Sequence, residues 1–168
     1  MITKRTMKGK PIIGFSSIYF NGNTRAIFEY MQTNLDEYDV FWVAKNLSTF
    51  RHVKKTGGKV FLMNGLLGLP YFLKTDVWIV AHSGLGNIPL LSKKNYKIVQ
   101  TWHGIGPKGL NLNNLYEKYD AWCVTSDFSK QRHIELWNAP PKKIYITGFA
   151  EMDRLYRYLK HSKKELLE

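Results

Sequence analysis

The stretch "NYKIVQTWHG", from Asn95 to Gly104, decides the fold class that we expect for this chain. It alternates like a strand and ends on a histidine and a glycine. Similar apolar runs occur at 11–17, 38–44, 57–64, 76–83, 119–126 and 142–148. Helix-length segments stand between or after these runs, at 24–35, 65–75, 128–137 and 151–168.

This alternation of strands and helices predicts an α/β fold. Parallel strands need crossover connections, and the resulting sheet is covered by helices on both faces, so we expect a Rossmann-like parallel sheet. In open sheets of this kind, ligands bind outside the carboxyl ends of the strands. The loops expected to share that edge are "FNGN", "AHSGLGN", "WHGIGPKG", "TSDFS" and "GFAEMD".

His103 belongs to this edge of the predicted sheet. Gly104 beside it permits close approach of the backbone to a ligand, and Lys108 supplies positive charge. Gly104, Gly106 and Gly109 have the spacing of the GxGxxG fingerprint, which alone is a weak signal, and the Walker phosphate loop is absent from this stretch. The expectation of a ligand site here therefore rests on the fold and on these residues, and not on a nucleotide-binding motif.

The composition is that of one globular domain with a strong positive charge. The chain has 168 residues, of which 44% are hydrophobic, and 25 Lys and Arg against 13 Asp and Glu give a net charge of +12. Such a charge predicts an anionic neighbour, and nucleic acid, anionic lipid headgroups and a polyphosphate-type substrate all satisfy it. No known nucleic-acid-binding motif is present, so we expect no nucleic acid partner.

Other features bear on location and on cofactors. The longest apolar stretch, Val60 to Leu73, is shorter than the roughly 20 residues needed to span a bilayer. The N-terminus lacks an apolar core of signal-peptide length. We expect a cytoplasmic protein bound peripherally to the inner face of the cell membrane. The lone Cys123 cannot form a disulfide within the chain, and we expect no cofactor. No metal-ligand spacing is recognisable, so no metal ligands are assigned and the need for a metal stays open.

Four stretches of the chain together resemble one known family. The stretch "VQTWHGIGPKGL" at 99–110 is similar to the tryptophan-histidine-glycine signature of the CDP-glycerol glycerophosphotransferases, the primases and polymerases of teichoic acid. Three more stretches resemble further motifs of that family in the same order: "NGNTRAIFEYM" at 21–31, "YDAWCVTSDFSKQ" at 119–131 and "ITGFAEMDRLY" at 146–156. The resemblance covers most of the chain.

The sequence departs from the family's pattern at two places. After the His-Gly pair the family carries Thr-Pro-Leu-Lys, where this chain has "IGPK" at 105–108. In the last stretch, Ala150 and Glu151 stand where proline and arginine are usual, whereas Asp153 matches. The second departure puts in doubt an anion contact that the resemblance would otherwise imply.

The resemblance implies a GT-B enzyme with two Rossmann-like halves, in which CDP-glycerol binds mainly to the second half. Residues 1–168 would then form a single Rossmann-like domain, the N-terminal acceptor-side half, with the donor-binding C-terminal half absent. The implied reaction transfers glycerol phosphate to a hydroxyl of a lipid-linked or polymeric acceptor. We expect the isolated chain to have little or no activity.

His103 is the expected catalytic base, because histidine titrates near neutral pH and the carboxyl edge of the sheet leaves it accessible. The substrate-binding residues expected with it are Asn23, His82, Gly104, Lys108, Ser126 and Asp153. A structural role competes for some of these, since His82 could cap a loop and Ser126 and Asp153 could each cap a helix. No G-x-S-x-G elbow surrounds Ser83 or Ser126, so we expect no serine nucleophile.

The main alternative function is a non-catalytic binding module for anionic polymer or membrane surface. A nucleic-acid-binding domain is a more distant alternative. Activity of the chain joined to a donor-binding half would separate the enzyme from the binding module. Binding to teichoic-type polymer and to DNA at matched salt would test the third reading.

Overall fold

The fold is built on one sheet of seven parallel strands. The computed structural model describes residues 9–81, 96–104 and 115–165. The strands are β1 (Ile12–Ser16), β2 (Asp39–Ala44), β3 (Val60–Leu62), β4 (Val77–Val80), β5 (Lys97–Gln100), β6 (Ala121–Val124) and β7 (Ile144–Ile146). They lie in the order β3-β2-β1-β4-β5-β6-β7 and every neighbouring pair is parallel. The predicted Rossmann-like parallel sheet is confirmed.

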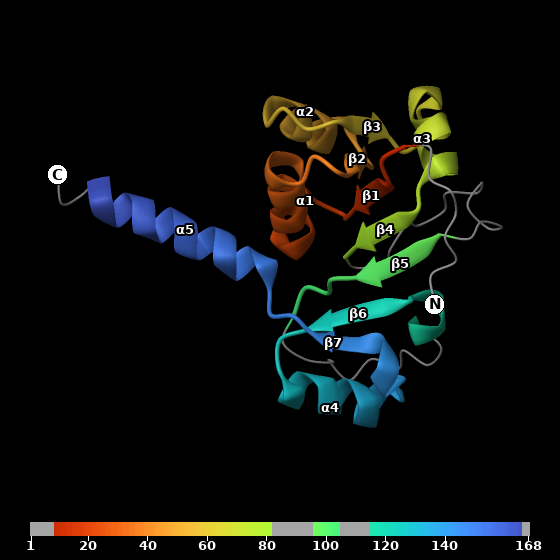
Figure 1. Cartoon of the computed structure of the whole chain (residues 1–168), viewed down its shortest axis with the longest axis vertical. Helices are drawn as coiled ribbons and strands as arrows, with labels where there is room; N and C mark the ends of the chain where they lie inside the picture. The colour runs from red at the N-terminus through yellow and green to blue at the C-terminus, as the bar shows by residue number, and fades with distance from the viewer. Residues whose placement is uncertain (1–8, 82–95, 105–114, 166–168) are drawn as a thin grey trace.

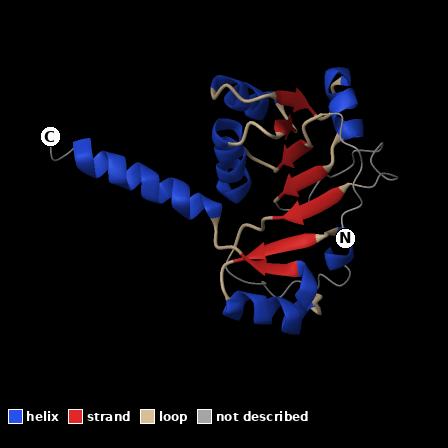
Figure 2. Cartoon of the chain, viewed as in Figure 1, coloured by secondary structure: helices blue, strands red, loops and turns tan. Residues whose placement is uncertain are grey.

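Helices cover this sheet on both faces (Figure 2). The α-helices are α1 (Gly22–Asn34), α2 (Leu47–Lys55), α3 (Leu69–Lys74), α4 (Asp127–Trp137) and α5 (Ala150–Glu165). Three short 3-10 segments complete the described elements: η1 (Leu66–Gly68), η3 (Leu115–Lys118) and η4 (Pro141–Lys143). In Figure 1, α1 and α2 lie beside β1 to β3, α4 lies beside β6 and β7, and α5 extends away from the sheet.

Strand β2 shows how the sheet forms two cores. Phe41 and Val43 pack into a cluster with residues of β4, β6, α3 and α4, whereas Trp42 and Ala44 pack into a second cluster with residues of β1, α1 and α2. All four side chains are fully buried. Burial of a large apolar side chain contributes about 1.5–3 kcal/mol, and burial on both faces explains why the strand has no polar alternation.

The sequence located most of these elements but missed α2. This helix begins after Asn46, whose side chain accepts a hydrogen bond from the backbone N–H of Thr49 at 2.8 Å. Only Thr49 and Val53 of its nine residues are buried. Because so little of the helix faces the core, its apolar spacing is too short to indicate a helix, although the Asn46 N-cap is a recognisable signal.

Two predicted helix starts had different outcomes. The helix expected over 24–35 begins two residues earlier than predicted, because α1 starts at Gly22 with Asn21 at the N-cap position. The cap expected at Ser126 is correct, since its hydroxyl accepts a hydrogen bond from the backbone N–H of Ser129 at 3.2 Å. The turn from β1 into α1 and the turn from β6 into α4 are therefore built differently.

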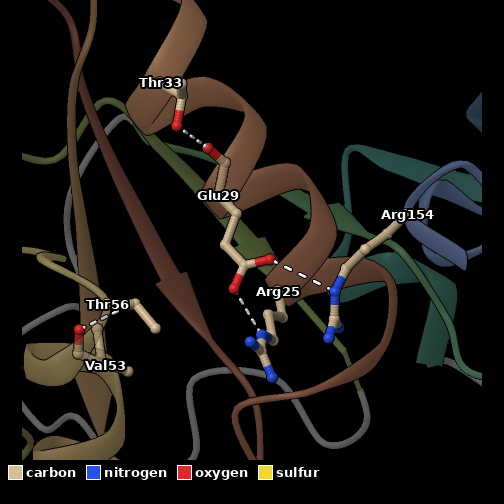
Figure 3. Close-up of polar contacts among 6 residues, drawn as sticks. All are labelled: Arg25, Glu29, Thr33, Val53, Thr56 and Arg154. Carbon is tan, nitrogen blue, oxygen red and sulfur yellow. Dashed lines mark hydrogen bonds and ion pairs between the residues drawn. The ribbon is translucent and has the colours of Figure 1, made fainter. Parts of the chain in front are cut away.

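The first turns of α5 are tied to α1 although the rest of α5 extends outward. Glu29 on α1 pairs with Arg25 at 2.7 Å and with Arg154 of α5 at 3.6 Å (Figure 3). These partly exposed ion pairs add little stability alone, but they join two helices that begin at the same edge of the sheet. The start of α5 is thereby held next to the start of α1.

Candidate functional site

A pocket of about 240 Å³ lies at the carboxyl edge of the sheet. Its lining comes from the ends of β1, β4 and β5 and from the starts of α1 and α5, namely Ser17, Asn21, Gly22, Asn23, Ala81, Trp102, His103, Phe149 and Glu151. Strands β2 and β3 follow β1 on one side, and β4 to β7 follow on the other side. The strand order therefore reverses between β1 and β4. Ligands of doubly wound sheets bind at this reversal, so the pocket occupies the position that the fold favours for a site.

His103 lines this pocket with an exposed side chain. It follows Trp102, whose φ of 53° is in the left-handed region that side chains other than glycine rarely adopt. Such a conformation costs on the order of 1–3 kcal/mol and persists where the surroundings enforce it. Both residues line the pocket, and their rings lie against each other with centroids 4.4 Å apart.

Buried Gln100 and the tryptophan ring both hold this turn. The Gln100 side-chain oxygen accepts a hydrogen bond from the Trp102 backbone N–H at 3.1 Å. The Trp102 ring packs against Trp122 and Trp137, with centroid distances of 5.2 and 5.5 Å. Anchored at backbone and ring, Trp102 presents the next residue, His103, to the pocket.

Asn23 connects the three segments around the pocket. Its side-chain amide donates to the backbone oxygens of Thr101 at 3.3 Å and Trp102 at 3.2 Å, and its oxygen accepts from the backbone N–H of Glu151 at 3.2 Å. The Asn23 side chain is buried, and both its nitrogen and its oxygen have hydrogen-bond partners within the protein. Asn23 lines the pocket as predicted, but the geometry makes it a residue that positions the β5 turn and the start of α5.

Two hydroxyl groups reinforce this arrangement beneath the pocket. Thr24 and Thr101 are buried with their hydroxyl oxygens 3.1 Å apart, and the Thr101 hydroxyl donates to the backbone oxygen of Val80. The ends of β4 and β5 and the first turn of α1 are thus joined by buried hydrogen bonds. These buried hydrogen bonds hold the backbone that carries the pocket-lining side chains.

The electrostatics of the pocket are mixed. The N-termini of α1 and α5 both open onto it, and the positive end of a helix dipole favours an anion. The first turn of α1 carries no acidic residue, whereas that of α5 carries Glu151 and Asp153. The Glu151 side chain lines the pocket and opposes an anion on that side.

The structure brings together only some of the predicted site residues. His103 and Asn23 share the pocket, and Gly104 follows His103 in the chain with room for a Cβ, whose nearest neighbour would be the Trp102 indole nitrogen at 3.8 Å. Ser126 caps α4 and Asp153 is exposed in the first turn of α5, and neither is among the residues that line the pocket. His82 and Lys108 lie outside the described residues.

Described residues of four of the predicted loops, "FNGN", "AHSGLGN", "WHGIGPKG" and "GFAEMD", line this pocket, so these loops share one edge as predicted. Sequence reasoning missed Ser17, Phe149 and Glu151 as lining residues and Gln100 as a support. Ser17 directly follows β1, so the carboxyl-end rule could have found it. Gln100 had no such signal, because a polar residue inside a strand is equally common on a solvent face.

Two general features complete the description of the site. Among the described residues no cluster of His, Cys, Asp or Glu is arranged to hold a metal ion. In the same part of the chain no helix is both long and apolar enough to cross a membrane. The described residues that line the pocket include the His103 imidazole, the Ser17 hydroxyl and residues at the starts of α1 and α5.

Comparison with protein families gives a match over the whole chain. Residues 1–168 match the family described as CDP-Glycerol:Poly(glycerophosphate) glycerophosphotransferase. No curated protein sequence matches the chain significantly.

Solved structures show the same fold at low sequence identity. The wall teichoic acid polymerase TagF has a TM-score of 0.71 and 19% identity, covering 94% of this chain and 42% of that one. A histidine-to-asparagine variant of TagF soaked with CDPG has a TM-score of 0.67 and 18% identity, covering 85% and 39%. A glycosyltransferase from Rickettsia africae ESF-5 has a TM-score of 0.58 and 15% identity, covering 83% and 42%. The chain thus spans well under half the length of these proteins, and the TagF matches support the GT-B-like assignment of its fold.

Proposed function

Because the chain belongs to the CDP-glycerol:poly(glycerophosphate) glycerophosphotransferase family, we propose that it takes part in building a teichoic-acid-like polymer. The reaction transfers glycerol phosphate from CDP-glycerol to a hydroxyl of a lipid-linked or polymeric acceptor. The observation that carries the proposal is the position of His103 in a pocket at the sheet's reversal point, between two helix N-termini. The CDPG soaked into a TagF variant supports the choice of donor.

His103 acts in this proposal as the general base. It accepts the proton of the acceptor hydroxyl, whose oxygen attacks the phosphorus that carries the glycerol. A new P–O bond forms there while the bond to the CMP phosphate oxygen breaks, and CMP leaves with the electron pair. Histidine suits this role because its ordinary pKa lies near neutral pH, where the base must be unprotonated.

The groups around His103 orient its side chain and stabilise the negative charge that develops on the phosphoryl oxygens. Residues at the starts of α1 and α5 line the pocket, and the positive ends of these helices favour phosphoryl oxygens, which gain negative charge as the CMP leaves. Asn23 and Gln100 fix the turn that presents His103, and Gly104 leaves space beside it. His82, Lys108, Ser126 and Asp153 stay predictions as substrate-binding residues, and the last two lie away from the pocket lining.

We further propose that residues 1–168 form one acceptor-side domain of a two-domain enzyme. More than half of each similar TagF structure lies outside the likeness to this chain, which leaves room for a second domain that binds the donor. The +12 charge supports peripheral attachment to an anionic membrane, where a lipid-linked acceptor would be found.

A second candidate function is a binding module without catalysis. Glu151 lines the pocket at a place where the resemblance implies arginine, and a carboxylate there weakens binding of an anionic donor. A module of this kind would hold the anionic polymer or the membrane surface without transferring glycerol phosphate.

A transfer assay tests the proposal. Label from CDP-[14C]glycerol is followed into a lipid-linked acceptor, with this chain alone and with the chain fused to the donor-binding half of a family member. We expect transfer by the fusion and little by the chain alone. A folded fusion that transfers nothing, although the same donor half is active with its own partner domain, would leave the binding module as the function.

A further inference from the structure

Glu151 places a carboxylate in the pocket that no other side chain neutralises. It lies in the first turn of α5, its side chain is exposed, and it lines the pocket together with His103. Within the described part of the chain, the Glu151 carboxylate makes neither an ion pair nor a hydrogen bond. An ionised carboxylate only accepts hydrogen bonds, so a ligand group beside it has to supply donors.

The arginine that could neutralise Glu151 is paired with another residue. Arg154 follows Glu151 by three positions, and side chains at this spacing are neighbours on a helix. Its Nε instead lies 3.6 Å from one carboxylate oxygen of Glu29 on α1 (Figure 3). Arg25 pairs with the other oxygen of Glu29 at 2.7 Å. Glu29 thus binds two arginines close to the pocket, and the Glu151 carboxylate stays available for a ligand.

The position of the Glu151 carboxylate is fixed by the start of α1. The backbone N–H of Glu151 donates to the side-chain oxygen of Asn23 at 3.2 Å. Its Oε2 lies 3.9 Å from the place that a Cβ on Gly22 would take. The first turn of α1 carries no acidic residue of its own. The positive end of this helix therefore stabilises the Glu151 charge without supplying a side-chain donor.

The charges around the pocket limit which ligand groups fit beside Glu151. A phosphate there is repelled by the carboxylate, and an ammonium group is repelled by the positive ends of α1 and α5. A neutral hydroxyl avoids both repulsions and donates a charge-assisted hydrogen bond to the carboxylate. Because the pocket measures only about 240 Å³, a ligand that fills it meets both Glu151 and His103.

We propose that Glu151 determines which acceptor end the pocket accepts. It binds a hydroxyl of a neutral polyol terminus, next to the hydroxyl that His103 deprotonates, and it disfavours an acceptor that ends in phosphate. The substrate class is thus a polyol phosphate chain whose last unit carries two neighbouring free hydroxyls. With one hydroxyl bound to Glu151, the helix ends are left for the phosphoryl oxygens of the transferred group.

This inference deepens the proposed function and rests on it for the identity of the acceptor chain and for the role of His103. Selection by Glu151 is a property of binding alone. It can therefore be measured on this chain without any transfer reaction.

The experiment measures binding of three synthetic oligo(glycerol phosphates) that differ only at one end. The first ends in glycerol with two neighbouring hydroxyls, the second lacks the inner of these hydroxyls, and the third ends in phosphate. Each is titrated into the chain at one salt concentration, and binding is followed through the backbone amide NMR signals of Gly22 and Asn23, which line the pocket.

The variants are Glu151→Gln and Glu151→Arg, with Glu37→Arg as the matched control. Glu37 is an exposed glutamate between the end of α1 and the start of β2, at the opposite edge of the sheet from the pocket. Its replacement changes the net charge as Glu151→Arg does. Thermal melts establish that all variants fold, which is expected because both side chains are exposed.

We expect the parent to bind the glycerol-ended oligomer roughly tenfold more tightly than the one without the inner hydroxyl, as for a hydrogen bond to a charged group. It should also prefer the glycerol end to the phosphate end, although its net charge of +12 favours the latter. Glu151→Gln should reduce both preferences, and Glu151→Arg should make the phosphate-ended oligomer the tightest ligand. Glu37→Arg should keep the order of the parent.

Several results overturn the inference. They are a parent that binds the phosphate-ended oligomer most tightly, equal binding with and without the inner hydroxyl, no response of the pocket amides, and a Glu37→Arg control that changes the order as Glu151→Arg does. A Glu151→Gln variant that melts earlier but keeps both preferences would limit Glu151 to stabilising α5. Transfer by the fusion without these preferences would leave the proposed function standing, and the preferences without transfer would do the reverse.

Discussion

The pocket and the aromatic cluster next to it use the same residue type in opposite ways. The aromatic cluster consists of Trp102, Trp122, Trp137 and His133, which pack between β5, β6 and α4. His103 is exposed in the pocket, and His133 is fully buried in the cluster. Burial and partners decide what a histidine does, since only the exposed one can exchange protons with a substrate.

His133 is built into the packing of α4. Its Nδ1 donates to the backbone oxygen of Ser129 at 2.7 Å, one turn earlier in the helix. Its ring meets the Trp137 ring edge-on, with centroids 4.9 Å apart. Burial lowers the pKa of His133, and the bond to Ser129 offsets only part of this, so folding favours the neutral form of the side chain. A neutral, enclosed imidazole stabilises the fold and has no route to the pocket chemistry.

The largest effect expected from this comparison is the loss of His103. In the proposed two-domain enzyme, His103→Ala should lower turnover by about 10²- to 10⁴-fold, because the proton-transfer contribution disappears. Affinity for CDP-glycerol and the melting temperature should change little, since the side chain is exposed. Turnover, donor affinity and melting temperature are measured on one preparation.

The matched control for this substitution is His52→Ala. His52 is an exposed histidine on α2 and is not among the residues that line the pocket. It should leave turnover within about twofold of the parent, as expected for a surface substitution. Near-normal turnover of a folded His103→Ala enzyme would remove the catalytic base from the proposal and favour the binding module.

The second effect concerns stability in the aromatic cluster. His133→Ala should lower the unfolding free energy by about 2–4 kcal/mol, because it leaves a cavity among three tryptophans and removes a buried hydrogen bond. Activity per folded molecule should be retained. Urea unfolding gives the free energy, and a variant as stable as the parent would show that the cluster tolerates the loss.

These two histidines also show what the sequence could predict. The alternation of strands and helices and the carboxyl-end rule placed His103 at the correct edge, because strand direction follows from sequence order alone. Hydrogen bonds across 78 and 128 residues, such as those of Asn23 to Thr101 and Glu151, have no local pattern. The sequence predicts Asn23 as a binding residue, and it could not show that the Asn23 amide bonds to Thr101, Trp102 and Glu151.

The third effect tests this positioning role. Asn23→Ala should lower the unfolding free energy by about 1–3 kcal/mol, because three buried or partly buried backbone groups lose a partner. Turnover should fall with it, since the left-handed turn at Trp102 loses a support, while the affinity for CDP-glycerol should be nearly unchanged. The measurements are unfolding in urea and the separate values of kcat and KM.

Two variants sharpen the Asn23 experiment. Asn23→Asp keeps the acceptor for the Glu151 N–H and loses both donors, so it isolates the bonds to the β5 turn. Thr33→Ala removes an exposed hydrogen bond on the same helix and should change neither quantity (Figure 3). A loss of stability in Asn23→Ala with kcat unchanged would mean that the clamp supports the fold and not the position of His103.

The smallest expected effect is a pH dependence of the unfolding free energy that arises from His133 in the aromatic cluster. The pKa of His133 in the folded protein lies below its unfolded value of about 6.5, so the unfolded chain binds a proton that the folded chain does not. The unfolding free energy should therefore be fully retained above about pH 6.5 and should fall as the pH drops from there towards the folded pKa, by at most about 1.4 kcal/mol per pH unit.

Asp120 also makes stability depend on pH, but in a lower pH range, so it does not affect this measurement. Burial tends to raise the pKa of Asp120, but hydrogen bonds from Lys97 and the Ile98 N–H outweigh it and lower the pKa, so its contribution is lost only below its ordinary value of 3.8. Between pH 7.5 and 5, the comparison of the parent with His133→Phe isolates the histidine, because phenylalanine fills the site without titrating. We expect the parent to lose stability relative to the variant as the pH falls. Parallel curves would mean that His133 takes up its proton as readily in the cluster as in water, which would contradict the contrast with the pocket.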